Sequence, residues 1–297
     1  MTSKNNGHNH IEQNASSRRI AVVFFLNLFF TIIEFVGGLL TNSTAIMADA
    51  VHDFGDTLSI GLAWVLSQLS GKHPTDEFTY GYYRFSLLGA LINGLILIVG
   101  SLWVLTEALP KLLNPEMPHA EGMFWLAILG VVVNGVAAWK LSAGKTMNER
   151  TLNWHLLEDV LGWVSVLIIS ILLIFFDWPV LDPLLSIVFT LFILLGVFRN
   201  IYRTVGIFLQ SVPDKKLLGD IRQVISSIQH VNSIHHLHLW TLDGERHVLT
   251  AHLDIDELSK VEEKQLKQHI NKLLAVFSLT HTTIELEMPE DICRDNI

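Results

Sequence analysis

Two pairs of histidine and aspartate with the same spacing stand inside apolar stretches of this sequence. His52 precedes Asp56 by four residues, and His155 precedes Asp159 by four residues. Residues four apart lie on one face of an α-helix, so each pair would present an imidazole nitrogen and a carboxylate oxygen together. Two nitrogens and two oxygens in a tetrahedral arrangement suit Zn²⁺. The sequence therefore predicts a metal site with four ligands, His52, Asp56, His155 and Asp159.

Further acidic residues accompany these pairs. Asp49 and Asp53 fall on the same face as His52, within an arc of about 100°, and Glu158 adjoins Asp159. We expect these three residues to serve as proton, water or helix-packing partners. A divalent ion held by two ionised aspartates and two neutral histidines leaves a neutral site, and such ligands bind metal in competition with protons. This chemistry favours transport of the ion, although one such pair alone would also fit a polar contact between helices.

The elements that carry these residues are long and apolar. Half of the 297 residues belong to the apolar set and only 16% are charged, which is typical of a membrane protein. A membrane-spanning helix needs about 20 mostly apolar residues. The sequence predicts six such helices, over residues 20–40, 44–69, 85–109, 122–141, 152–176 and 178–209. The second and fifth are the weakest on hydropathy, because they contain the predicted metal ligands.

Charge indicates orientation and excludes some functions. Lysines and arginines gather in the loops on one side and after the sixth predicted span, whereas the opposite loops contribute only Lys111. Cytoplasmic loops carry an excess of lysine and arginine, so both termini are expected in the cytoplasm. The expected location of the protein is the inner (cytoplasmic) membrane of the cell. The net charge of −9 argues against nucleic-acid binding. The single Cys293 excludes an internal disulfide, and the sequence leaves its role open.

The composition becomes that of a soluble segment after residue 212. Residues 215–228 and 258–276 have helical spacing, while 234–242, 247–255 and 282–288 alternate as strands do. The expected domains are a cytoplasmic tail over 1–17, a transmembrane domain over 18–212 and a cytoplasmic αββαβ domain over 213–297. Strict alternation would place His236 and His238 on one face of the first strand and His235 on the other.

Several motifs together resemble the cation diffusion facilitator family, and within it the bacterial zinc exporters. They extend over almost the whole chain and comprise NSTAIMADAVH at 42–52 followed by Asp56, YGY at 80–82, the pair His155 and Asp159, DP at 182–183, HHLHLW at 235–240 and TAH at 250–252. The resemblance implies that His52, Asp56, His155 and Asp159 form a transport site that opens alternately to each side and releases metal as protons enter. It also implies a homodimer with metallochaperone-like cytoplasmic domains.

The resemblance is weaker in the cytoplasmic domain. His235 and His252 stand where some members have metal-binding histidines, but Glu285 and Glu287 occupy positions where those members have histidine and aspartate. A regulatory zinc site of His235 and His252 with Glu287 or His281 is one interpretation. The other is that these histidines serve only the fold and the surface.

Three rival functions follow from the sequence. The same ligand set would also accept Fe²⁺, Co²⁺, Ni²⁺, Mn²⁺ or Cd²⁺. A membrane metalloenzyme would need an open coordination position and a general base, but the chain has no His-Glu-x-x-His motif. The third rival function is a metal sensor that does not transport the ion. The favoured prediction is a secondary transporter that exports Zn²⁺ in exchange for H⁺, with no prosthetic group and no enzymatic activity.

Overall fold

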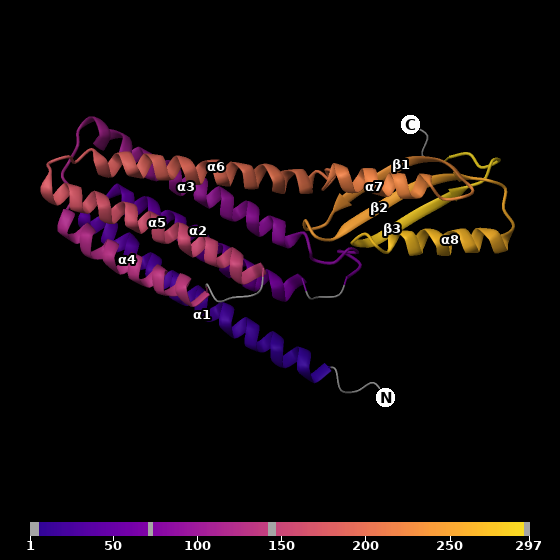
Figure 1. The fold of residues 1–297 in the computed structure, drawn as a ribbon, viewed down its shortest axis with the longest axis horizontal. Helices are drawn as coiled ribbons and strands as arrows, with labels where there is room; N and C mark the ends of the chain where they lie inside the picture. The colour runs from indigo at the N-terminus through magenta and orange to yellow at the C-terminus, as the bar shows by residue number, and fades with distance from the viewer. Residues whose placement is uncertain (1–5, 71–73, 142–146, 294–297) are drawn as a thin grey trace. The chain divides into compact units, whose positions relative to one another are not determined.

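The computed structural model describes residues 6–70, 74–141 and 147–293, except for the side chains at 6–23, 63–64, 67–68, 70, 140–141 and 147–155. Its first part is a bundle of long helices that lie side by side (Figure 1). The helices are α1 (Asn6–Thr41), α2 (Thr44–Ser70), α3 (Phe85–Leu113), α4 (Ala120–Leu141), α5 (Met147–Phe175) and α6 (Leu181–Phe208).

Each of the six apolar ranges expected from the sequence is helical, with ends that differ by a few residues. The exception is α1, which begins at Asn6, inside the segment expected to be a polar tail. Among the described residues, five helices are long and apolar enough to cross a membrane, namely α1, α3, α4, α5 and α6. Helix α2 is not one of them and carries Asp49, Asp53 and Asp56.

Small residues and one large aromatic residue hold α4 and α5 together. Trp163 of α5 is 1% exposed, and its indole ring lies directly against Gly130 of α4, where any Cβ would overlap it. Ile46 of α2 and Met123 of α4 complete this buried cluster. Because Trp163 follows Asp159 by one helical turn, this packing also fixes the part of α5 that carries Asp159.

The C-terminal segment contains two helices and a three-stranded sheet. Its elements are α7 (Lys215–Ser226), β1 (Val231–Thr241), β2 (His247–Ile255), α8 (Lys260–Leu274) and β3 (Leu279–Glu287). Strand β2 is central, antiparallel to β1 and parallel to β3. Ile221 and Ile225 of α7 and Ile270 of α8 share one core with the apolar residues of the sheet. Ser259 and Glu262 form a capping box that begins α8.

The chain divides into two compact units, and residues 74–88, which lead into α3, belong to the second, with residues 202–293. Within that unit the Tyr80 ring lies edge-on to the His281 ring at 5.0 Å. The Arg246 guanidinium lies over the Tyr83 ring at 4.0 Å. The part of the chain around Tyr80 and Tyr83, before α3, therefore packs as part of the C-terminal unit.

Candidate metal centre

The start of α2 is fixed by a carboxylate from α6. The Oδ2 atom of Asp182 accepts hydrogen bonds from the backbone nitrogen of Thr44 at 2.8 Å and from its hydroxyl at 2.9 Å, and Ser43 also donates to this carboxylate. Asp182 is 1% exposed. It satisfies backbone donors at the helix N-terminus, where a negative charge is favourable. Helices α2 and α6 therefore begin at the same level.

Helices α2 and α5 bring one imidazole and two carboxylates together. Donor atoms of His52, Asp53 and Asp159 all lie within 4.8 Å of one another, and Asp53 and Asp159 are both buried. The Oδ2 atom of Asp56 lies 3.6 Å from Nε2 of His52. The predicted ligands His52 and Asp159 thus meet, Asp56 contacts His52, and Asp53 stands closer to this group than the sequence suggested. The side chain of His155 lies outside the described residues, although its backbone is part of α5.

Two more carboxylates are buried in the bundle. Glu34 of α1 is 1% exposed and Asp49 of α2 is 4% exposed. The Oδ2 atom of Asp49 has no hydrogen-bond partner among the described residues. Ionised carboxylates in an apolar interior need a cation or protons to compensate them. The centre of this bundle is therefore suited to bind positive charge.

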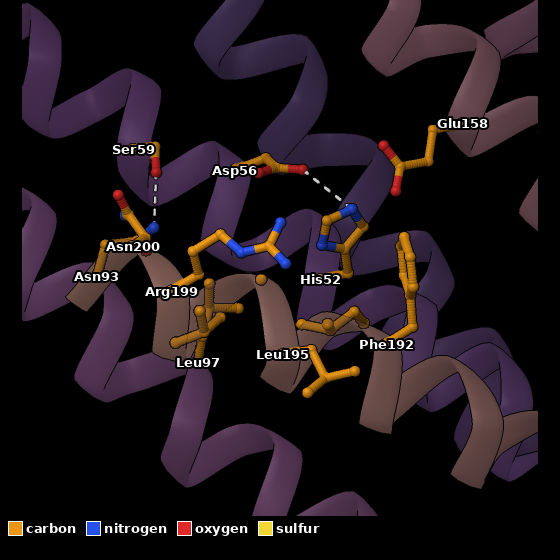
Figure 2. Close-up of a pocket in the computed structure, with 13 residues that line it drawn as sticks. His52, Asp56, Ser59, Asn93, Leu97, Glu158, Phe192, Leu195, Arg199 and Asn200 are labelled. Atoms are coloured by element: carbon orange, nitrogen blue, oxygen red, sulfur yellow. Dashed lines mark hydrogen bonds and ion pairs between the residues drawn. The ribbon is translucent and has the colours of Figure 1, made fainter. Parts of the chain in front are cut away.

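His52 and Asp56 form part of the wall of a cavity of about 510 Å³. Figure 2 shows their side chains together with Glu158 from α5 and Arg199 from α6. The Nδ2 atom of Asn93 donates to Oγ of Ser59 at 2.7 Å on another side of the cavity. The cavity gives a small cation a polar route to the His52–Asp56 pair.

A second cluster of metal-binding groups lies on the C-terminal sheet. Donor atoms of His235, His252, Glu287 and Cys293 lie within 4.8 Å of one another. The carboxylate of Glu287 lies between the two imidazoles. Its Oε1 atom lies 2.7 Å from Nδ1 of His252, and its Oε2 atom lies 3.1 Å from Nε2 of His235. The Sγ atom of Cys293 lies 3.5 Å from Nδ1 of His252. The sequence suggested the first three residues but not Cys293, which follows the last strand and belongs to no spaced motif.

The expected alternation of histidines along β1 is wrong. The pairing of β1 with β2 shifts between His235 and His238, and His236 has a positive φ of 46°, as at a β-bulge. The rings of His235 and His236 consequently lie 5.4 Å and 5.1 Å from the His252 ring. The bulge thus brings the rings of both His235 and His236 close to His252.

Buried carboxylates and an imidazole inside a bundle of membrane-length helices define a multi-pass membrane protein that handles cations. Comparison with protein families agrees with this class. Residues 20–209 match the family described as the cation efflux transmembrane domain, and residues 213–289 match the cytoplasmic domain of cation efflux proteins. The chain belongs to the cation efflux family, the cation diffusion facilitators, as the sequence motifs indicated.

Bacterial relatives cover almost the whole chain. A "Cadmium, cobalt and zinc/H(+)-K(+) antiporter" of Bacillus subtilis is 33% identical over 286 residues, which are 95% of this chain and 92% of that protein. The "Metal cation efflux system protein CzcD" of Cupriavidus metallidurans is 30% identical over 284 residues, 95% of this chain and 90% of that protein. "Zinc transporter ZitB" of Escherichia coli is 29% identical over 282 residues, 94% of this chain and 90% of that protein. All three relatives are named for metal transport or efflux.

Proposed function

We propose that this protein exports Zn²⁺ from the cytoplasm in exchange for protons, with Zn²⁺ as its cargo and no prosthetic group. The transport site comprises His52, Asp56, His155 and Asp159. The observation that carries this proposal is the meeting of His52 from α2 with Asp159 from α5, since each belongs to a histidine-aspartate pair of the same spacing. The names of the relatives support metal efflux.

The chemistry of the ligands supports zinc and proton exchange. Imidazole nitrogen and carboxylate oxygen together suit Zn²⁺, whereas Mg²⁺ and Ca²⁺ prefer oxygen alone. Co²⁺, Cd²⁺, Ni²⁺, Fe²⁺ and Mn²⁺ are the alternative cargoes for the same ligands. Protonation of His52 removes its capacity to bind metal, so protons and Zn²⁺ exclude each other at the site.

The remaining parts of the proposal concern the arrangement in the membrane. Helix α2 also crosses the membrane, which brings the number of spans to six, because Asp49 and Asp53 are buried in the bundle rather than exposed to lipid. The transmembrane domain extends over 18–212, and the tail over 1–17 and the domain over 213–297 are cytoplasmic. The chain is a homodimer in the inner membrane, in keeping with the cytoplasmic domain family that it matches.

Zinc flux into proteoliposomes tests the site. Asp159→Asn should abolish flux, because it removes one anionic ligand from a site that depends on four. Asp177→Asn changes an exposed aspartate at the end of α5 in the same way and should leave flux unchanged. Parent-like flux in Asp159→Asn, with parent-like insertion and dimer content, would contradict the proposed site.

We also propose a regulatory zinc site on the C-terminal sheet, with ligands His235, His252 and Glu287. The observation in its favour is the convergence of these groups with the Cys293 thiol. Two imidazoles, a carboxylate and a thiolate suit Zn²⁺ in a closed four-ligand site.

Cobalt is a suitable probe for this second site, because Cys293 is the single cysteine of the chain. Bound Co²⁺ gives a near-ultraviolet charge-transfer band only when a thiolate is among its ligands. The band should develop in the parent and in Asp159→Asn, and should be lost in Cys293→Ser and His252→Ala. Absence of the band in the parent would exclude Cys293 from the ligand set.

A further inference from the structure

Helix α6 carries a positive charge at the end of a long apolar stretch, just before Asn200. Between Asp182 and Arg199 the helix has no charged residue. A charged side chain in a membrane span is costly, and it almost always faces a protein interior or an aqueous cavity, where it pairs with another group. The Arg199 side chain is exposed, and carboxylates that could pair with it stand on the neighbouring helices.

Arg199 lines the same cavity as His52, Asp56 and Glu158. Figure 2 shows its guanidinium group extended toward the His52–Asp56 pair. One turn earlier on α6, a Cβ at Gly196 would meet nothing within 4 Å. Gly196 thus leaves open space in the wall of the cavity that Arg199 also lines.

The helical rise places Arg199 within reach of Asp56. Helices α2 and α6 begin at the same level, since Asp182 binds the backbone of Thr44. From that level Asp56 lies ~18 Å and Arg199 ~26 Å along the helix axes at 1.5 Å per residue. An extended arginine side chain covers most of this difference. Arg199 therefore stands on the cavity side of the transport site, between it and the far ends of α2 and α6.

We propose that Arg199 is the built-in counter-cation of the empty transport site, an inference that rests on the proposed function. When the site holds no metal, its guanidinium pairs with Asp56 and Glu158, since its donors match carboxylate oxygens. An arriving Zn²⁺ must displace this pairing, and the guanidinium returns as the metal leaves. Arg199 is a positioning residue that sets the affinity for metal and speeds its release.

Competition of this kind predicts a specific change in the kinetics. Arg199→Gln removes the competing charge, so the KM for Zn²⁺ should fall about tenfold, and kcat should fall with it because release slows. Arg199→Lys retains a positive charge but loses the planar set of donors, so its KM should lie between those of the parent and Arg199→Gln. Arg203→Gln makes the same substitution one turn further along α6, outside the residues that line the cavity, and should change neither constant.

The experiment measures zinc flux into proteoliposomes as a function of external Zn²⁺ at fixed pH and membrane potential, with full-length protein. A rival role, in which Arg199 only reaches out to lipid head groups, would lower the amount of inserted protein without lowering KM. A KM in Arg199→Gln that equals or exceeds that of the parent overturns the inference. Arg199→Met is also uncharged and must show the same fall in KM. This variant provides the test if Arg199→Gln does not fold.

The site variant separates this inference from the proposed function. If Asp159→Asn loses flux and Arg199→Gln leaves KM unchanged, the inference alone is wrong. If Asp159→Asn transports zinc as the parent does, the proposed site is wrong, and the role of Arg199 is wrong with it.

Discussion

His52 lies close to carboxylates from both α2 and α5, and its nitrogen is the softest ligand that α2 offers. Its ring lies 3.6 Å from Asp56 and within 4.8 Å of the nearest donor atoms of Asp53 and Asp159. The surrounding groups are hard carboxylate oxygens. The identity of residue 52 should therefore influence which metals the site prefers.

Exchange of this nitrogen for oxygen should alter selectivity. His52→Asp leaves a metal-binding group four residues before Asp56 but adds a negative charge and a harder ligand. The variant should still transport metal and should accept Mn²⁺ or Cd²⁺ better, relative to Zn²⁺, than the parent does. Competition assays in proteoliposomes measure this preference. An unchanged order of preference in an active variant would show that other residues set selectivity.

A pH effect is expected at Asp256, which follows β2. Hydrogen bonds from Asn232 and His230 lower the pKa of Asp256 below the usual aspartate value. The folded state then binds fewer protons than the unfolded state, so the stabilisation is present above the usual pKa and is lost as pH falls through the lowered pKa. Asn232→Ala should lower the melting temperature of the C-terminal unit at neutral pH, and the difference should shrink in acid. A difference that persists at acidic pH would contradict this cause.

At the scale of elements, contact between α4 and α5 determines where Asp159 stands. Trp163 lies against Gly130, and Trp163 follows Asp159 by one turn of α5. Any side chain at position 130 must push the indole ring, which is fully buried. A substitution at Gly130 of α4 should therefore displace Trp163 and, through it, Asp159, although it changes no metal ligand.

Gly130→Ala tests this connection. Overpacking of this kind typically costs 1–3 kcal/mol, so the variant should melt at a lower temperature and transport zinc more slowly. Gly135→Ala is the matched control in the same helix, because a Cβ there meets nothing within 4 Å. Equal stability and flux in the two variants would show that α4 can move away from Trp163 freely.

The elements themselves were predictable, and the details of the sites less so. Apolar runs of membrane length and the alternating segments after residue 212 predicted the helices and strands to within a few residues, except for the start of α1, which lies at Asn6. Alternation could not predict the bulge at His236, because a positive φ at a non-glycine residue leaves no periodic signal. Proximity of Asp53 depends on how α2 is rotated against α5, and Cys293 joins the sheet through a segment without any pattern.

At the scale of the whole molecule, we expect the C-terminal domain to stabilise the dimer and tune transport rather than to carry the ion. Truncation after Val212 should weaken dimerisation, as measured by the mass of the purified particle. Some zinc flux should remain, and Asp159→Asn should abolish it. A correctly inserted truncated chain that binds no zinc at the transport site would contradict this division of roles.

The central claim is that Zn²⁺ and protons exchange through one site inside the helical bundle. Its most direct test is simultaneous measurement of zinc and pH inside proteoliposomes at a clamped membrane potential, for the parent and for Asp56→Ala. The account predicts that zinc entry is accompanied by proton exit in the parent and that both movements disappear in Asp56→Ala. Zinc movement that is independent of protons, or that persists undiminished in Asp56→Ala, would contradict it.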